Sequence, residues 1–317
     1  MLSLVAPSAS AQGIPGVDTL TLTLSPKHPR PYDTVKVTVS STLVNLAASE
    51  ITITANGEVV AERSRTASVT FGGPGTKTTI RVVAVAPDAT HVKELTIAPA
   101  DVVLIVESPT SAHPFYEGAR LVASEGPVRL VALPDFQSSP GVRIPAKDLS
   151  YTWRFGDRLL HDYSGLGQNV LPATAPVRYR DADVTVTVTT RDGTLVAETT
   201  QAVVPTDPVM RIYRNDPLLG PLFEHALSGT YRLPGAEDTL RMIPYFFSGT
   251  PTLAWTLNGN PAGGDDDLTL RATGNEGGTA SVRASASEIG GTLPRIADSG
   301  LTVEFGGKSV LDSLFSL

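Results

Sequence analysis

Apolar residues alternate with polar residues over short stretches along the whole chain. Near its start, Leu20, Leu22 and Leu24 alternate with threonines, and Val35, Val37 and Val39 repeat the pattern. A strict period of two is typical of a strand with one buried face. Alternating or short apolar stretches recur at Ile51–Ile53, Val69–Phe71, Ile80–Val85, Leu95–Ile97, Val102–Val106, Val128–Leu133, Val184–Val188, Leu195–Ala197, Leu268–Leu270, Val282–Ala284 and Leu301–Phe305. The pattern therefore predicts an all-β protein.

One stretch organises the rest of the chain. Between Leu149 and Asp157, Trp153 alternates with polar residues and shares a face with Tyr151 and Phe155 before a glycine turn. The same arrangement returns about a hundred residues later around Trp255, at 253–259, and a weaker copy lies at 51–57. These copies predict three modules, at residues 17–99, 100–206 and 207–306.

The second and third modules resemble each other more than either resembles the first. Pro114–Ala119 corresponds to Pro221–Ala226, and Leu130 corresponds to Leu240. Six or seven strands in about eighty residues suit an immunoglobulin-like sandwich. The links at Ala98–Asp101 and Pro205–Pro208 are short and contain proline, which limits bending. We therefore expect three tandem Ig-like β-sandwich domains in an elongated array.

Composition excludes several classes of function. The net charge of −7 argues against nucleic acid and anionic membrane surfaces as partners, since both require a basic face. The chain has no cysteine, which excludes disulfides, thiolate nucleophiles and thiolate metal sites. No apolar run approaches the ~20 residues that a membrane-spanning helix needs.

Both ends of the chain differ from the modules. Residues 1–16 contain an apolar start and the small residues Ala9–Ala11, which fit the end of a secretory signal. A basic beginning is missing, so a signal-peptide remnant and a flexible N-terminus both remain open. The apolar tail, residues 307–317, suits a short helical turn, a docking strand or a frayed end. The sequence favours export to the cell surface or the medium.

The Trp153 strand carries a resemblance to a known family. Tyr151, Trp153, Phe155, Gly156 and Asp157 resemble the motif of PKD domains, in which a core tryptophan precedes a Phe-Gly-Asp-Gly turn. Arg158 replaces the last glycine, and the third module departs further. The layout also resembles exported Ig-like surface proteins predicted in candidate-phylum bacteria, where a segment like Pro217–Gly220 precedes the tryptophan strand. The resemblance implies a bacterial surface location and no catalytic residues.

Several residues could carry chemistry, and each has a structural interpretation. Trp153 and Trp255 could stack on sugars, but their apolar neighbours favour a core role. Gly72–Lys77 is glycine-rich, but it lacks the Gly-Lys-Ser/Thr order of a phosphate loop and predicts a hairpin loop instead.

Charged candidates are equally open to a structural interpretation. Asp265–Asp267 could bind calcium, but consecutive carboxylates without EF-hand spacing favour a solvated acidic turn. The same interpretation applies to Asp181 and Asp183. Glu117 and Glu224 recur at matching places, which predicts that each caps a local turn. The histidines show no zinc spacing: His28, His91, His113, His161 and His225. We therefore expect no catalytic, cofactor or metal residues.

Three functions remain open at this point. The first is a non-enzymatic structural or interaction protein of the cell surface, whose loops or strand edges bind a protein or glycan. The second is a carbohydrate-binding or adhesive array, which requires exposed aromatic residues; the candidates are Tyr163, Tyr179, Tyr213 and Tyr231. The third is an enzyme, which requires a polar cleft where titratable groups converge.

Overall fold

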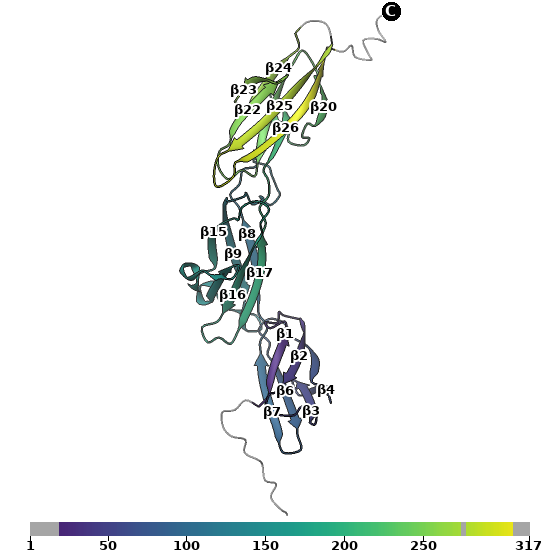
Figure 1. Cartoon of the computed structure of the whole chain (residues 1–317), viewed down its shortest axis with the longest axis vertical. Coiled ribbons are helices and arrows are strands. Elements are labelled where there is room, and N and C mark those ends of the chain that lie inside the picture. Colours follow the sequence, from purple (N-terminus) through teal and green to yellow (C-terminus); the bar gives the residue numbers. More distant parts are fainter. Residues whose placement is uncertain (1–18, 274–276, 307–317) are drawn as a thin grey trace, which may run out of the picture. The chain divides into compact units, whose positions relative to one another are not determined.

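The computed structural model describes residues 19–273 and 277–306, and it is built almost entirely of strands (Figure 1). Its only helical elements in these ranges are two 3-10 turns, η1 (Ala146–Asp148) and η2 (His161–Tyr163). Neither they nor any other described segment forms a helix able to cross a membrane. The predicted signal remnant and the apolar C-terminal tail lie outside the described residues.

The first group of strands forms a two-layered sandwich. One sheet has the order β1-β2-β5 and the other β4-β3-β6-β7, all pairs antiparallel. Inward residues of both sheets, among them Val37 and Ile53, share one buried apolar cluster. The strands are β1 (Thr21–Ser25), β2 (Thr34–Ser40), β3 (Glu50–Ala55), β4 (Glu58–Glu62), β5 (Thr66–Thr70), β6 (Thr78–Val85) and β7 (Thr90–Ile97).

The next group repeats this strand order. One sheet runs β15-β9-β8, and the other runs β13-β12-β16-β17 with β14 beside β12. Val184, Val186 and Val188 are buried while the threonines between them are partly exposed. The strands are β8 (Asp101–Glu107), β9 (Pro127–Asp135), β10 (Gln137–Ser139), β11 (Val142–Arg143), β12 (Ser150–Phe155), β13 (Arg158–Leu159), β14 (Gly165–Leu166), β15 (Val170–Thr174), β16 (Ala182–Thr189) and β17 (Val196–Val203).

The last group forms the most extensive sandwich, called the third sandwich below. Its sheets have the orders β19-β18-β21-β24 and β20-β26-β25-β22-β23, and β20 is parallel to β26. Trp255 and Phe247 lie in its buried cluster. The strands are β18 (Val209–Asp216), β19 (Gly220–Pro221), β20 (Gly229–Arg232), β21 (Glu237–Tyr245), β22 (Thr252–Leu257), β23 (Asn260–Gly263), β24 (Asp267–Arg271), β25 (Gly278–Glu288) and β26 (Arg295–Phe305).

The two tryptophans confirm their predicted core role and the repeat itself. Both side chains are fully buried, and each indole nitrogen donates to a backbone carbonyl further along the chain, in the connection before β15 or β24. Trp153 Nε1 donates to Gln168 O at 2.8 Å, and Trp255 Nε1 donates to Asp265 O at 3.0 Å. A buried indole N–H needs such an acceptor. Each tryptophan therefore holds the segment that carries its acceptor, at Gln168 or Asp265, as well as packing in the core.

Asn56 and Gly57 form the tight turn between β3 and β4, with both residues at positive φ, 51° and 88°. Some strands were not predicted because their sequences lack alternation. In β15, Pro172 interrupts the pattern, yet the strand forms because it is an edge strand paired only with β9. The strands β20 and β23 are four residues long and contain glycine or proline. They tolerate these residues because they too are edge strands.

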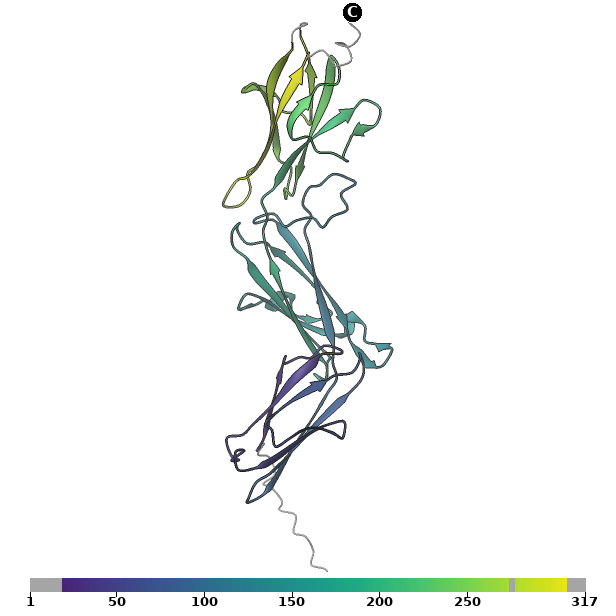
Figure 2. The same cartoon turned by 90° about the vertical axis from the view of Figure 1, so that its right-hand side faces the viewer.

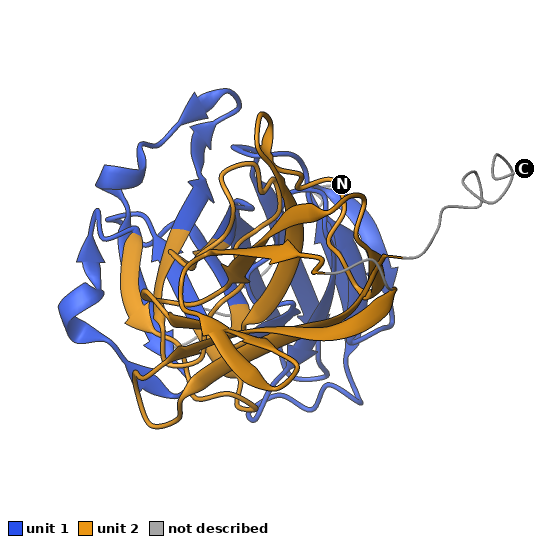
Figure 3. Ribbon diagram, turned by 90° about the horizontal axis from the view of Figure 1, so that it is seen from above, with its two compact units in different colours: residues 1–104, 132–169, 185–200 blue, residues 105–131, 170–184, 201–317 orange. Residues whose placement is uncertain are grey.

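The chain divides into two compact units, which Figure 3 shows in two colours. Unit 1 contains residues 1–104, 132–169 and 185–200, and unit 2 contains residues 105–131, 170–184 and 201–317. The strands β8, β9, β16 and β17 each contribute residues to both units. The fold is thus all-β and made of tandem immunoglobulin-like sandwiches, whereas the domain boundaries at 99/100 and 206/207 remain predictions.

Candidate functional site: an aromatic and ionic junction in unit 2

The charged candidates from the sequence have mainly structural surroundings. Asp267 is held by Arg241, whose Nε and Nη2 donate to it at 2.7 and 2.6 Å. Asp265 instead offers its backbone carbonyl to Trp255. Glu117 and Glu224 are exposed, and neither forms a hydrogen bond or ion pair with any residue that the structure describes. The predicted turn-capping role of these two glutamates is therefore wrong.

The four tyrosines proposed as a sugar-binding row do not share one environment. Tyr179 and Tyr163 are exposed, Tyr231 is half-buried and donates to Asp238, and Tyr213 is buried. The hydroxyls of Tyr213 and Tyr245 lie 2.8 Å apart inside unit 2. Burial, together with this hydrogen bond, raises the pKa of Tyr245. Tyr213 is thus a structural residue.

The segment Ser108–Gly126, which connects β8 to β9, is the centre of the most elaborate contact region in unit 2; we call it the docked loop. Ser111 N donates to Phe247 O at 2.8 Å, and Phe246 N donates to Ser111 O at 2.7 Å. The Ser111 hydroxyl donates to Pro244 O and accepts from Phe247 N. One serine therefore forms four hydrogen bonds, one to Pro244 in β21 and three to Phe246 and Phe247 directly after it.

Phe246 shows how firmly this contact is fixed. Its φ of 64° lies in the left-handed region, which is uncommon for a residue that is not glycine. This conformation lets consecutive residues point in different directions. Phe247 enters the core of the third sandwich, whereas Phe246 joins a separate cluster with Tyr213 and Tyr245.

Aromatic side chains of the docked loop complete that second cluster. The ring of His113 stacks on Phe223 with centroids 4.3 Å apart, and Tyr116 meets Tyr245 edge to face. Phe115 N donates to His113 Nδ1 at 3.1 Å, so this nitrogen acts as the acceptor and the ring is held in place. The repeated segments at 114–119 and 221–226 are thus brought close together by His113 and Phe223.

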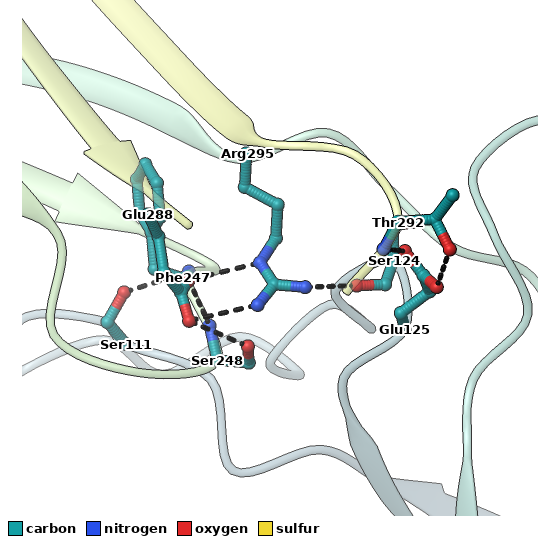
Figure 4. A network of polar contacts seen from close by, with 8 residues as sticks. All are labelled: Ser111, Ser124, Glu125, Phe247, Ser248, Glu288, Thr292 and Arg295. Carbon is teal, nitrogen blue, oxygen red and sulfur yellow. Dashed lines mark hydrogen bonds and ion pairs between the residues drawn. The ribbon is translucent and has the colours of Figure 1, made fainter. Parts of the chain in front are cut away.

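A buried ion pair lies at the other side of the docked loop (Figure 4). Arg295 Nε and Nη2 donate to the two carboxylate oxygens of Glu288, at 3.1 and 3.0 Å, and Arg295 Nη1 donates to Ser124 O at 2.5 Å. The side chains of Arg295 and Glu288 are only 8% and 12% exposed. Glu288 also accepts from Ser248, so both carboxylate oxygens and all three guanidinium nitrogens take part in hydrogen bonds.

A neighbouring contact extends this network to the turn between β25 and β26. Glu125 accepts from Thr292 N at 2.7 Å and from Thr292 Oγ1 at 2.8 Å (Figure 4). Gly291, at φ +80°, allows the approach, because a Cβ there would lie 2.5 Å from a carboxylate oxygen of Glu125. The docked loop is therefore bound to the third sandwich along aromatic, backbone and ionic contacts.

The pKa of Glu288 makes this network sensitive to acid. Burial alone would raise the pKa, but hydrogen bonds from Arg295 and Ser248 outweigh burial and hold it below its ordinary value of 4.5. A carboxyl whose pKa is lower in the folded than in the unfolded state stabilises the fold at any pH above its unfolded-state pKa. This stabilisation disappears as the pH falls through its folded-state pKa.

We expect the free energy of unfolding to fall between pH 5 and pH 3 more steeply in the wild type than in Glu288→Gln. Urea denaturation at each pH measures this, and equal slopes would contradict the assignment.

Unit 1 contains a second region where loops from two groups of strands meet. Arg30 and Asp101 form an ion pair at 3.1 Å, and a Cβ on Gly75 would lie 2.4 Å from the backbone carbon of Ser139. A cavity of about 790 Å³ lies there, lined by residues that include Lys77, Thr96, Asp148, Arg191 and Asp192. Asp192 accepts hydrogen bonds from Thr190 and Thr194, which engage its carboxylate.

The histidines and the remaining acidic residues are not brought together. His91 Nδ1 lies 3.2 Å from Thr19 Oγ1, and burial, reinforced by Lys27, lowers the pKa of His28. In residues 19–273 and 277–306, no three histidine or acidic side chains form a group that could hold a metal ion. Sequence reasoning missed the junction itself, although Glu288 and Arg295, of opposite charge, flank a Gly-Gly turn and were a usable signal.

Comparisons with known proteins give no family for this chain. No protein-family model matches it, and no curated protein sequence matches it. Solved structures with similarity include three N-terminal domains of the Highly Immunogenic Outer Capsid protein of bacteriophage RB49, at 13% identity and TM-score 0.27, covering 92% of this chain and 99% of that one. The central fibronectin-III region of RIM-binding protein is 11% identical, with TM-score 0.26 and coverage of 90% and 98%. Sidekick-1 immunoglobulin domains 1–5 are 8% identical, with TM-score 0.27 and coverage of 91% and 59%.

Proposed function

We propose that the chain is a non-enzymatic structural or interaction protein that acts at the cell surface or in the medium. The observation that carries this proposal is the junction in unit 2. A buried, hydrogen-bonded ion pair and a cluster of aromatic rings there hold the docked loop on the third sandwich. Such a well-defined contact within unit 2 suits a protein with a structural or interaction role.

The surroundings of the candidate residues support the same proposal. Both tryptophans are used in cores, and Asp267, Asp192 and Glu288 are engaged by neighbouring donors. The unpaired backbone groups of edge strands such as β7 and β24 are natural docking sites for a protein partner. The small residues at Ala9–Ala11, which fit the end of a secretory signal, support a location outside the cytoplasm.

Surface exposure on intact cells tests the proposal. Cells of the source organism are treated with a protease that cannot cross the envelope, and the chain is followed with an antibody in cell, envelope and medium fractions. Loss of the envelope signal on protease treatment, or recovery from the medium, is the expected result. A protected, purely cytosolic pool would overturn the proposed location, and a cytoplasmic marker protein controls for lysis.

A further inference from the structure

An apolar cavity lies at the end of the third sandwich where β26 finishes. Its volume is about 250 Å³, and residues from both sheets line it. The large apolar side chains in its lining are Leu233, Leu257, Leu268, Leu270, Val303 and Phe305. An apolar cavity of about 150 Å³ is already large enough for a benzene molecule. The cavity therefore has room for an aromatic side chain.

The polar groups of the lining leave the interior of the cavity apolar. Asn258 Oδ1 accepts from Ser281 N at 2.8 Å, and Arg271 forms an ion pair with Glu237. Both Asn258 and Arg271 are exposed, whereas four of the six large apolar side chains are buried. A side chain that enters the cavity therefore meets mainly aliphatic and aromatic carbon, and hydrophobic burial governs what binds there.

The described part of the third sandwich ends beside this cavity. Phe305 is the last residue of β26 and lines the cavity, and Gly306 lines an adjoining pocket that shares Leu233 and Phe305 with it. Gly306 has a φ of 68°, in the left-handed region, which takes the backbone out of the extended path of the strand. The C-terminal tail, residues 307–317, therefore begins beside the cavity.

The sequence of the C-terminal tail complements the cavity. Val310 and Leu314, and likewise Leu311 and Phe315, are four positions apart. This spacing is typical of side chains that share one face of a helix. The polar residues of the same stretch are Ser309, Asp312, Ser313 and Ser316. The tail thus offers one aromatic and three aliphatic side chains at positions that suit a single apolar face.

We propose that the C-terminal tail binds in the cavity of its own chain, with Leu314 and Phe315 as the side chains that enter it. Leu314 lies eight positions after Gly306, a span of about 12 Å in a helix and up to about 28 Å when extended, so it reaches the cavity in either form. The short link gives the tail a high effective concentration, which favours its own cavity over that of a second copy. The stretch that follows Thr273 in the lining, residues 274–276, has no apolar side chain.

Crosslinking within one chain tests this site, because the natural chain has no cysteine. Ser313→Cys in the tail is combined with Thr273→Cys, which replaces an exposed residue of the cavity lining. The matched control combines Ser313→Cys with Thr279→Cys. Thr279 is exposed and pairs with Glu304 near the start of the tail, but its neighbour Ala280 lines the cavity, so Thr279 points to the opposite face of the sheet.

Both variants are treated with a short bismaleimide at low protein concentration, and peptide mapping follows each link over time. The link between positions 313 and 273 is expected to form several times faster than the control link, because docking holds the tail at the cavity, whereas a free tail reaches both positions. Equal rates, or faster linking to position 279, would overturn the proposal. Links that form only between two copies would assign the cavity to the tail of a neighbouring copy and would overturn it as well.

Trypsin cleavage after Lys308 provides a second measurement, since cleavage requires release of the tail. The double variant Leu314→Ser and Phe315→Ser is expected to raise the cleavage rate at least about tenfold, whereas Ser313→Ala is expected to leave it unchanged. A tenfold change corresponds to about 1.4 kcal/mol, which is less than the burial of one phenylalanine side chain contributes. Equal rates in the wild type and the double variant would contradict docking through these side chains. Neither measurement depends on where the protein acts, so this site and the proposed function fail separately.

Discussion

Replacing Arg295 with methionine is expected to destabilise unit 2 by about 3–5 kcal/mol, because it leaves the buried Glu288 carboxylate without its partner. Methionine keeps much of the aliphatic packing and removes the charge, so the loss reports the unpaired carboxylate. The chain has two tryptophans, and a Trp153→Phe background leaves Trp255 as the reporter within the third sandwich. Urea denaturation followed by Trp255 fluorescence measures the free energy of unfolding.

A matched surface pair serves as the control for this result. Arg271 and Glu237 lie across neighbouring strands of the same sandwich but are largely exposed, so Arg271→Met is expected to change the free energy of unfolding far less than Arg295→Met does. Adding Glu288→Gln to Arg295→Met removes the buried charge and is expected to restore part of the loss. Equal effects of Arg295→Met and Arg271→Met would show that burial does not govern the energetics of the Arg295 pair.

Replacing Trp255 with alanine is the change with the second large expected effect, about 3–5 kcal/mol. The substitution leaves a cavity among the buried residues of the third sandwich and leaves the Asp265 carbonyl without its indole donor. Trp153→Ala is expected to have a similar cost, because its side chain is equally buried and has the same kind of acceptor. Denaturation followed by far-ultraviolet circular dichroism measures both.

The exposed Tyr179 is a suitable control for loss of an aromatic side chain. Tyr179→Ala removes a ring that stacks only with the Arg178 guanidinium and is otherwise open to solvent, so a change within about 0.5 kcal/mol is expected. Tryptophans that act as exposed sugar platforms would give equally small changes on substitution. That outcome would contradict their assignment to the cores.

The sequence predicted the fold where one face of a strand is buried. The alternation at Val35–Val39 and at Val184–Val188 identifies β2 and β16, because burial of one face selects apolar residues at every second position. Short edge strands such as β15 and β20 were not predicted, because pairing with a neighbouring strand, and not an alternating sequence, holds them in place. The hydrophobic pattern therefore predicts central strands but not short edge strands.

The junction could be predicted only in part. Pro114–Ala119 and Pro221–Ala226 were recognised as repeated, yet their acidic residues were given a capping role that the structure contradicts. Aromatic residues carry the contact instead: the ring of Phe223 stacks on His113, which directly precedes the first segment, and its centroid lies 6.1 Å from that of Phe115. Arg295 and Glu288 are close in sequence, but Arg295 also donates to Ser124 O, which is distant in sequence. Contacts between segments far apart in the chain cannot be predicted from a local sequence pattern.

Amide hydrogen exchange at Ser111 tests most directly whether the docked loop is a built junction or a simple connection. The Ser111 N–H donates to Phe247 O beside Phe246, whose φ is positive. Its protection against exchange is therefore expected to be comparable to that of the amides in β21. Figure 2 shows the chain turned by 90° from the view of Figure 1. Arg295→Met is expected to lower this protection. Exchange of Ser111 at the rate of an unstructured peptide in the wild type would contradict the account.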